Sequence, residues 1–282
     1  MNEKACFIIG LPNAGKTTYL AALSYALMQK KTKTKLHFSR YSGNQQYFAK
    51  LANVWLEATE VARTSKQIEQ ASLLIDLVDD DHNPYVITFP DLSGETFQRQ
   101  YVDREMEPEI ALAISNSDSV ILFVNPTDIK ESTLIPMVTP ELRAGTNCDE
   151  PRNREPIRDD PTAVVLVELL SFISFIKKDC KIRLTIVVSA WDTVNKDYAI
   201  PEECIKNRMP LLWQYVCSNP LLFDCTYYGV SAQGGDLKDE EASEALLEKY
   251  QNNPAERVSV VDNNGKIGHD ISLPLWTAMN LN

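Results

Sequence analysis

The sequence predicts an α/β fold with three layers, in which helices cover both faces of a mostly parallel central sheet that contains one antiparallel strand. Two observations lead to this prediction. Short apolar runs of strand length alternate with longer stretches of helical spacing along most of the 282 residues. Loops rich in glycine, serine and aspartate follow several of these apolar runs, and open α/β sheets carry their functional loops at the carboxyl ends of strands.

The overall composition indicates a globular protein with a core of its own. Hydrophobic residues make up 44% of the chain and charged residues 24%, which is ordinary for this class. The net charge of −11 argues against binding to nucleic acid or to an anionic membrane, since both need a positive field. No apolar run reaches the roughly 18 residues of a membrane span. The six cysteines are scattered without a C-x-x-C pair, and the first strand begins too early for a signal peptide, so we expect reduced thiols and a cytoplasmic location.

The first strand is predicted over residues 5–9 and leads into a loop of the form G-x-x-x-x-G-K-[ST], followed by a helix over residues 18–28. A strand, this loop and a helix in that order predict a phosphate-binding P-loop, and with it a P-loop NTPase sandwich. Glycines in the loop permit a close backbone approach that a Cβ would block. Backbone amides at the start of the helix point at the phosphates. We therefore expect nucleotide contacts from Gly10, Asn13, Ala14, Gly15, Lys16, Thr17 and Thr18.

Two side chains of this loop carry the phosphate chemistry. Lys16 would reach the β- and γ-phosphates, which also makes it a candidate catalytic residue. The hydroxyl of Thr17 would bind Mg²⁺.

A short strand is predicted over residues 36–39 and a helix over 44–63. Residues 71–78 and 85–89 predict an antiparallel hairpin across the acidic turn 79–84. The three aspartates of this turn lack the spacing of an EF-hand, so a solvated turn is favoured over a metal site.

The hairpin runs into a D-x-x-G sequence formed by Asp91 and Gly94. In a protein with a P-loop, such an aspartate orders Mg²⁺, usually through water, and the glycine amide can sense the γ-phosphate. We therefore predict Asp91 as a metal-site residue, Gly94 as a nucleotide contact and residues 91–107 as a switch segment.

Residues 118–125 predict a buried strand, and the segment 127–161 that follows carries five prolines and a dense mixture of charges. We interpret this segment as an insertion with little regular structure. It is either a plain surface loop or an element that binds a partner or covers the nucleotide. The remaining elements are predicted as helices over 162–178 and 201–216, strands over 182–188 and 224–230, and a C-terminal extension, 236–282, with an acidic helix (238–250), a hairpin (257–269) and a short helix (273–279).

Two more polar loops follow strands, with the sequences Ser-Ala-Trp-Asp at 189–192 and Ser-Ala-Gln at 231–233. Together with residues 10–17 and 91–94, their order resembles the Ras-like GTPases of the translation-factor-related (TRAFAC) class over about residues 4–235. The resemblance implies a single GTPase-like domain over 1–282, Mg²⁺ as cofactor, hydrolysis of GTP to GDP and phosphate, and a conformational switch that engages a protein effector.

The resemblance assigns guanine recognition to two loops, N/T-K-x-D and S-A-K/L. Asp192 fits the carboxylate that accepts hydrogen bonds from guanine N1–H and the 2-amino group. Ala190 replaces the family lysine, and Trp191 could either stack on the base or simply pack. In the second loop the Ala232 amide would meet guanine O6. The nucleotide contacts implied here are Ala190, Trp191, Asp192, Ser231, Ala232 and Gln233.

The resemblance also requires a threonine that binds Mg²⁺ and lies between the first helix and the strand before D-x-x-G. Thr64 is the first choice, with Ser65, Thr59 and the more distant Thr34 as alternatives. Arg63 is adjacent to Thr64 and could act as an internal arginine finger, the alternative being an ordinary surface arginine.

Many members of the class place glutamine directly after D-x-x-G, whereas this chain has Glu95. A carboxylate near the γ-phosphate adds negative charge unless it is protonated or acts as a base. We therefore expect slow intrinsic hydrolysis, or hydrolysis completed by a partner that supplies an arginine. The catalytic candidates are Lys16, Thr64, Arg63 and Glu95. Two other functions stay open: a nucleotide-binding interaction module that has lost hydrolysis, and an ATPase or kinase with the same P-loop.

A narrower resemblance concerns the wide spacing before D-x-x-G, the Ser-Ala-Trp-Asp loop, the charged insertion and the Ser-Leu-Pro-Leu-Trp sequence near the end of the chain. These features are similar to a bacterial group called double-GTPases, which is expected to work beside GTPase-activating proteins in conflict or antiphage gene clusters. The partners implied are GTP and GDP, a protein effector and a GTPase-activating protein, without nucleic acid and without membrane insertion.

Overall fold

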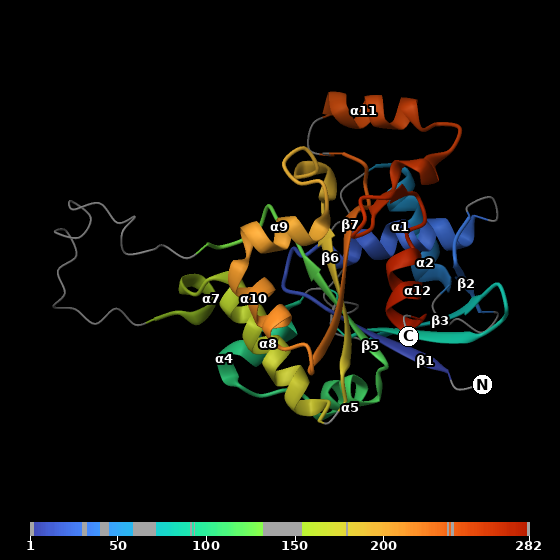
Figure 1. Cartoon of the computed structure of the whole chain (residues 1–282). Coiled ribbons are helices and arrows are strands. Elements are labelled where there is room, and N and C mark those ends of the chain that lie inside the picture. The colour runs from blue at the N-terminus through green and yellow to red at the C-terminus, as the bar shows by residue number, and fades with distance from the viewer. Residues whose placement is uncertain are drawn as a thin grey trace, which may run out of the picture.

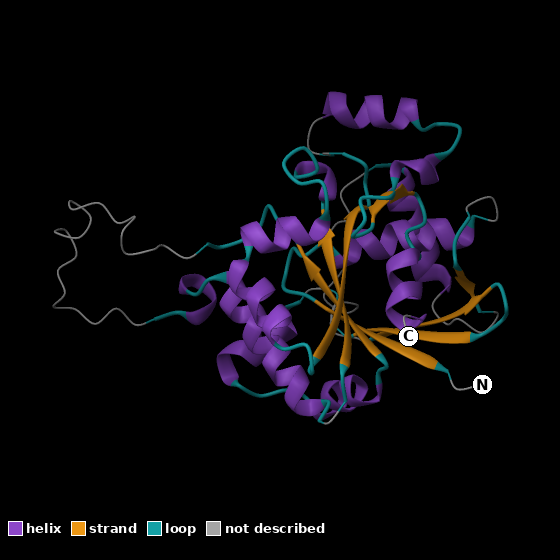
Figure 2. Cartoon of the chain, viewed as in Figure 1, coloured by secondary structure: helices purple, strands orange, loops and turns teal. Residues whose placement is uncertain are grey.

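The computed structural model of the protein places helices on both faces of one sheet (Figure 1, Figure 2). The described residues hold nine strands in the order β2-β3-β4-β1-β5-β6-β7-β8-β9. The α/β prediction with helices on both faces is therefore confirmed. The structure describes residues 3–29, 33–39, 45–58, 72–90, 92, 94–131, 154–178, 180–235, 237 and 240–280.

Five parallel strands form the middle of the sheet. All residues of β5 are buried, and β1 and β6 are buried over most of their length. Parallel strands covered on both faces appear in a sequence as continuous apolar runs, which is why these strands could be recognised. In sheet order they are β4 (Pro84–Phe89), β1 (Lys4–Ile9), β5 (Ser119–Val124), β6 (Ile182–Ser189) and β7 (Phe223–Ser231).

The expectation of one antiparallel strand is wrong, because two of the described strands run against the others. On one side, β3 (Leu73–Asp79) is antiparallel to both β4 and β2 (Leu36–Phe38). On the other side, β8 (Ser259–Val261) is antiparallel to both β7 and β9 (Ile267–Gly268). Both predicted hairpins, β3–β4 and β8–β9, are confirmed. The second antiparallel strand, β8, is present because the hairpin β8–β9 also joins the main sheet, beside β7.

The acidic turn between β3 and β4 is organised by one carboxylate. Asp79 accepts hydrogen bonds from the backbone N–H groups of Asp81 and Asn83 and from the Tyr85 hydroxyl, at 2.9–3.0 Å. Burial alone would raise the pKa of Asp79, but the hydrogen bonds from Asn83 and Tyr85 outweigh it and hold that pKa below its usual value. Among the described residues no group of three His, Cys, Asp or Glu side chains could hold a metal ion.

One face of the sheet is covered by α1 (Lys16–Met28), α2 (Gln45–Leu56) and α12 (Leu273–Asn280) (Figure 1). The side chains of α1 are buried around most of the helix, since it lies between the sheet and α2. Tyr19 of α1 packs edge-on against Phe123 of β5, with ring centroids 4.9 Å apart.

In the part of the chain that the structure describes, the other face carries five helices, and two of them were predicted as a single helix. The helix predicted over 201–216 is interrupted at Met209, where φ is −136° and ψ is 63°. The ring of Pro210 disfavours a helical conformation of the preceding residue and removes a backbone N–H. The helices are α4 (Glu95–Asp103), α5 (Pro108–Asn116), α8 (Thr162–Ile176), α9 (Pro201–Arg208) and α10 (Pro210–Ser218).

The remaining described segments lie at the periphery. Of the insertion predicted over 127–161, residues 132–153 lie outside the described part, and the rest contains α7 (Pro156–Asp159). No helix in the described part combines the length and apolar character needed to cross a membrane. The other short elements are η2 (Trp191–Thr193), α11 (Glu240–Lys249) and η3 (Pro254–Arg257).

Candidate functional site

The glycine-rich loop joins β1 to α1 at the carboxyl edge of the parallel strands, as predicted. Gly15 begins α1 with a φ of +89°, a conformation that residues with a Cβ rarely adopt. A Cβ on Gly15 would lie 2.8 Å from both Cβ and Oγ of Ser189. The loop therefore rests directly on the end of β6, and glycine is needed for this approach.

The phosphate chemistry of a P-loop depends on its lysine, and Lys16 is only 2% exposed. Its ammonium group donates hydrogen bonds to the carbonyl oxygens of Gly10 at 2.7 Å and Leu11 at 3.0 Å. The charge is thus held against the backbone of the loop itself. The hydroxyl of the next residue, Thr17, lies 3.5 Å from the Leu92 carbonyl, which brings it to the D-x-x-G segment.

Gly94 ties the D-x-x-G segment to the P-loop by a close contact of two backbones. Its φ is +82°, and a Cβ there would lie 2.5 Å from the Leu11 carbonyl carbon and 2.7 Å from the Gly10 oxygen. Only glycine fits such an approach without a backbone shift. The structure therefore brings Lys16, Thr17 and Gly94 together, although they come from segments about 80 residues apart in the sequence.

Several predicted residues cannot be placed. Thr64, Arg63 and Asp91 lie outside the described residues, as do the alternatives Thr59 and Ser65.

The alternative metal ligand Thr34 is described, and its position contradicts that role. Thr34 precedes β2, whose first residue, Leu36, pairs with Asp79 at the end of β3. This end of β3 lies beside the start of β4 and hence beside Lys4 at the start of β1. Thr34 is therefore at the edge of the sheet opposite to the P-loop.

Glu95 is the first residue of α4 and is exposed. A carboxylate in the first turn of a helix interacts favourably with the positive end of the helix dipole. Glu95 can therefore stabilise the start of α4, in addition to any role at the phosphate.

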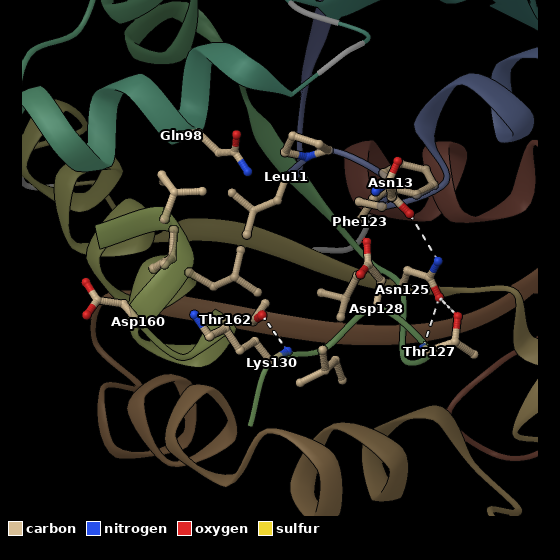
Figure 3. A pocket seen from close by; sticks show the side chains of 17 residues that line it. Leu11, Asn13, Gln98, Phe123, Asn125, Thr127, Asp128, Lys130, Asp160 and Thr162 are labelled. Atoms are coloured by element: carbon tan, nitrogen blue, oxygen red, sulfur yellow. Dashed lines mark hydrogen bonds between the residues drawn. The ribbon is translucent and has the colours of Figure 1, made fainter. Parts of the chain in front are cut away.

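Sequence reasoning did not find Asn125, which follows β5 and holds the P-loop in place. Its Nδ2 donates to the Asn13 carbonyl at 3.1 Å, and its Oδ1 accepts from the Thr127 backbone N–H at 3.0 Å and hydroxyl at 2.8 Å (Figure 3). Asn13 is held at a φ of +60°. The sequence signal that could have identified Asn125 is a polar side chain directly after a buried strand. Open α/β sheets place site residues at this position.

The first candidate base-recognition loop follows β6. Ala190 has a φ of +47°, and its carbonyl accepts a hydrogen bond from the Thr193 hydroxyl at 2.7 Å. Trp191 is 2% exposed and packs on Gly229, where a Cβ would lie 2.4 Å from the indole ring. These contacts favour packing over stacking on a base. Asp192 is half-buried, and within the described part no hydrogen bond or ion pair engages its carboxylate.

The second candidate loop follows β7, which is the parallel neighbour of β6, so both loops leave the same edge of the sheet. The Ser231 hydroxyl accepts a hydrogen bond from the Gly234 backbone N–H at 3.1 Å, which closes the loop. The Ala232 carbonyl accepts a hydrogen bond from the indole N–H of Trp55 at 2.7 Å. Trp55 belongs to α2 and was not expected at this site.

A cavity of about 540 Å³ lies beside the P-loop (Figure 3). Its lining includes Asn13 and Ala14 of the P-loop but neither Lys16, Thr17 nor Asp192. The residues around it come from the outer side of the P-loop, the end of β5, the loop after it, α4, α7 and the start of α8: Leu11, Pro12, Asn13, Ala14, Gln98, Phe123, Val124, Asn125, Thr127, Asp128, Ile129, Lys130, Ile157, Asp160, Thr162, Val165 and Leu166.

These features define the class of P-loop GTPases. They are a P-loop on a parallel sheet, a D-x-x-G segment that lies against it, and two polar loops that follow neighbouring strands. The model of the Double-GTPase 1 family matches residues 7–278. The chain therefore belongs to the Double-GTPase 1 family.

Three solved structures with similarity to the chain have GTP or GTP binding in their descriptions. The Ski7 GTPase-like domain of S. cerevisiae, bound to GTP, is 15% identical with a TM-score of 0.44, and the match covers 83% of this chain and 43% of that one. Elongation factor SelB from Methanococcus maripaludis, with the GTP analogue GppNHp, is 14% identical with a TM-score of 0.38 and coverage of 89% and 35%. A putative nucleolar GTP-binding protein 1 from Plasmodium falciparum is 13% identical with a TM-score of 0.38 and coverage of 89% and 95%. The chain thus spans less than half of the first two. No curated protein sequence matches the chain.

Proposed function

We propose that the protein is a regulatory GTP-binding protein that hydrolyses GTP slowly and changes its interaction with a protein effector. The observation that carries this proposal is the contact of the D-x-x-G segment with the P-loop, where Gly94 lies against the Leu11 and Pro12 backbone. A γ-phosphate on this loop would be sensed directly by Gly94, because no side chain separates the two backbones. Residues 57–70 and 91–107 are the proposed switch segments.

The phosphate contacts in this proposal come from the P-loop. The backbone amides from Asn13 to Thr18 would surround the phosphates, and the Lys16 ammonium would move from the loop carbonyls to the β- and γ-phosphate oxygens. Thr17 fits a magnesium site, since its hydroxyl oxygen already lies next to the segment that carries Asp91. Mg²⁺ bound there would neutralise phosphate charge. Thr64 and Asp91 are the further ligands proposed from the sequence.

The base contacts in this proposal come from the two loops after β6 and β7. The half-buried carboxylate of Asp192 would accept hydrogen bonds from guanine N1–H and the 2-amino group. The Ala232 amide would donate to guanine O6. The absence of the family lysine at Ala190 weakens the base contact without changing its specificity, because that lysine packs along the base rather than reading its edge.

Hydrolysis is proposed to be slow because Glu95 stands where a neutral, water-orienting glutamine is common. A carboxylate there repels the γ-phosphate. A GTPase-activating protein that supplies an arginine would complete the site, and Arg63 is the internal candidate for that role. A binding module without hydrolysis is the second candidate function, and it is favoured by the position of Glu95 in the first turn of α4, where its charge stabilises the helix.

The proposal is tested by competition between nucleotides, measured as displacement of a fluorescent GDP analogue. GDP should compete and ADP should not. The Asp192→Asn variant should bind GDP about tenfold to a hundredfold more weakly, since an unpaired buried polar group costs about 1–3 kcal/mol. It should gain affinity for xanthosine diphosphate, whose 2-oxo group can accept a hydrogen bond from the new amide.

The matched control is Asp224→Asn, because Asp224 is an exposed carboxylate near the start of β7, at the other end of the sheet. This variant should bind all three nucleotides like the unchanged protein. A preference for ADP, or an Asp192→Asn variant with unaltered guanine and xanthine affinities, would contradict guanine recognition and favour an ATPase or kinase.

A further inference from the structure

Trp55 is the buried side chain that connects α2 to the loop 231–234. It is 0% exposed, and its indole N–H donates the 2.7 Å hydrogen bond to the Ala232 carbonyl across 177 residues of sequence. A buried indole N–H without a partner is costly, so this bond is maintained wherever the ring is buried. The Ala232–Gln233 peptide is planar, so fixing its carbonyl also fixes the Cα of Ala232. The Ala232 N–H belongs to the preceding Ser231–Ala232 peptide and is joined to that fixed Cα, so only the backbone torsions of Ala232 separate its direction from the fixed plane.

Arg257, at the end of η3, holds Trp55 from another side. The guanidinium carbon lies 3.9 Å from the indole centroid, and the group donates hydrogen bonds to the carbonyls of Trp55 and Leu56. These are the last carbonyls of α2, where the helix dipole favours a cation. Arg257 is 2% exposed, and burial lowers its pKa to about 10, so the charge remains at neutral pH.

The other end of the loop is fixed by the backbone of the same arginine. Gly234 has a φ of +84°, and a Cβ there would lie 2.6 Å from the Arg257 carbonyl oxygen. The loop 231–234 is therefore held at Ala232 by the Trp55 side chain and at Gly234 by the Arg257 backbone. Both contacts come from elements outside the P-loop and the strands that carry the site.

We propose that Trp55 and Arg257 are positioning residues for base selectivity, because they set the place of the Ala232 amide relative to the 6-oxo group of guanine. This inference rests on the proposed function. It adds that recognition of the 6-oxo group depends on a tryptophan of α2 and an arginine of the C-terminal extension, neither of which contacts the nucleotide. This positioning would affect the binding of purine nucleotides that have a 6-oxo group.

The test compares GDP with 2-aminopurine riboside diphosphate, which lacks the 6-oxo group, in titrations of the full chain. Trp55→Phe keeps an aromatic ring and removes the N–H. It should weaken GDP binding about threefold to tenfold, the range expected for one hydrogen bond, and leave the 2-aminopurine nucleotide unaffected. A general loss of structure would weaken both ligands equally, so the ratio of the two affinities separates positioning from folding.

Gly234→Ala disturbs the other end of the loop without removing a core ring, and it should change the same ratio in the same direction. Tyr85→Phe is the matched control, since it removes a buried hydroxyl that donates to Asp79 at 2.9 Å in the same core, and the ratio should stay constant. Equal weakening of both nucleotides, or an unchanged ratio in Trp55→Phe and Gly234→Ala, overturns the inference. If the unchanged protein does not prefer GDP to ADP, the proposed function itself fails.

Discussion

The P-loop and the candidate base-recognition loop 231–234 leave the same edge of the sheet, but different contacts hold them in place. The P-loop is fixed by neighbouring segments at close range: Gly15 lies on Ser189, and Gly94 lies on the Leu11 backbone. The loop 231–234 is fixed from outside, by a side chain of α2 and by η3 near the C-terminus.

Because the contacts differ, we expect substitutions in the two loops to have different effects on nucleotide binding. A contact between backbones leaves no room for a Cβ and cannot relax by a change of rotamer. The loop 231–234 is held at Ala232 by a side chain, that of Trp55, and this end can shift by a small distance when the side chain changes. We therefore expect substitutions at the P-loop to abolish or strongly reduce nucleotide binding, and substitutions around the base loop to alter selectivity.

The largest effect is expected for Lys16→Ala. Loss of the ammonium removes charge-assisted hydrogen bonds to two phosphates of GTP, each worth about 1.5–3 kcal/mol, so GTP affinity should fall by at least about a hundredfold. GDP has no γ-phosphate and loses one such bond, so its affinity should fall by about tenfold or more. Isothermal titration measures this change. The control is Lys130→Ala, which removes a cation from the cavity beside the P-loop and should leave the affinity unchanged. Binding of GTP to Lys16→Ala at normal strength would show that the phosphates lie elsewhere.

A smaller effect is expected for Gly94→Ala. The new Cβ would lie 2.5 Å from the Leu11 carbonyl carbon, so the D-x-x-G segment must move away from the P-loop. Affinity for a non-hydrolysable GTP analogue should fall about tenfold, in line with a strained left-handed residue and lost contacts worth about 1–2 kcal/mol. The preference for GDP over ADP should remain, because the base loops are untouched.

Gly268→Ala is the matched control for this variant, since a Cβ on Gly268 meets nothing within 4 Å. It should bind the analogue normally. If Gly94→Ala instead lost base selectivity while keeping its affinity for the analogue, the separation of the two parts of the site would be wrong.

The smallest effect is expected for Glu95→Gln. Removing the carboxylate should raise GTP turnover about fivefold without weakening GTP binding, because the charge that repels the γ-phosphate disappears. The free energy of unfolding should fall by about 0.5 kcal/mol, since α4 loses a favourable charge in its first turn.

Glu109→Gln, in the first turn of α5, should show the same loss of stability without the change in turnover. Phosphate release measures hydrolysis, and urea unfolding measures stability. A kcat of several per second for the unchanged protein alone would contradict slow hydrolysis.

The parts of the fold that could be predicted from the sequence are those specified by residues close together in the chain. The strand, glycine loop and first helix follow from residues next to one another, and so do both hairpins. The break at Met209 was also readable, because Pro210 marks it, but the apolar spacing of the segment hid it. The helix α4 was missed because its N-cap is Gly94, which offers no side-chain capping signal.

Contacts between distant segments explain what could not be predicted. The approach of Trp55 to Ala232 spans 177 residues, and no spacing rule connects them. The burial of Trp191 depends on Gly229 of the neighbouring strand, so stacking and packing could not be distinguished from the sequence. The addition of β8 and β9 to the sheet is also set by tertiary packing, although their hairpin turn is local.

The position of α12 also bears on how the protein is made in the cell. Leu275, Ala278 and Met279 of this helix complete the core that α1 and α2 share with the sheet. A ribosome delivers the chain from its N-terminus onward. The P-loop therefore emerges before α12, and the apolar surface beneath α12 stays open to water until residues 273–280 have left the exit tunnel. Synthesis that stops before this helix leaves a nascent chain in which the part of the core that α12 covers is exposed to water.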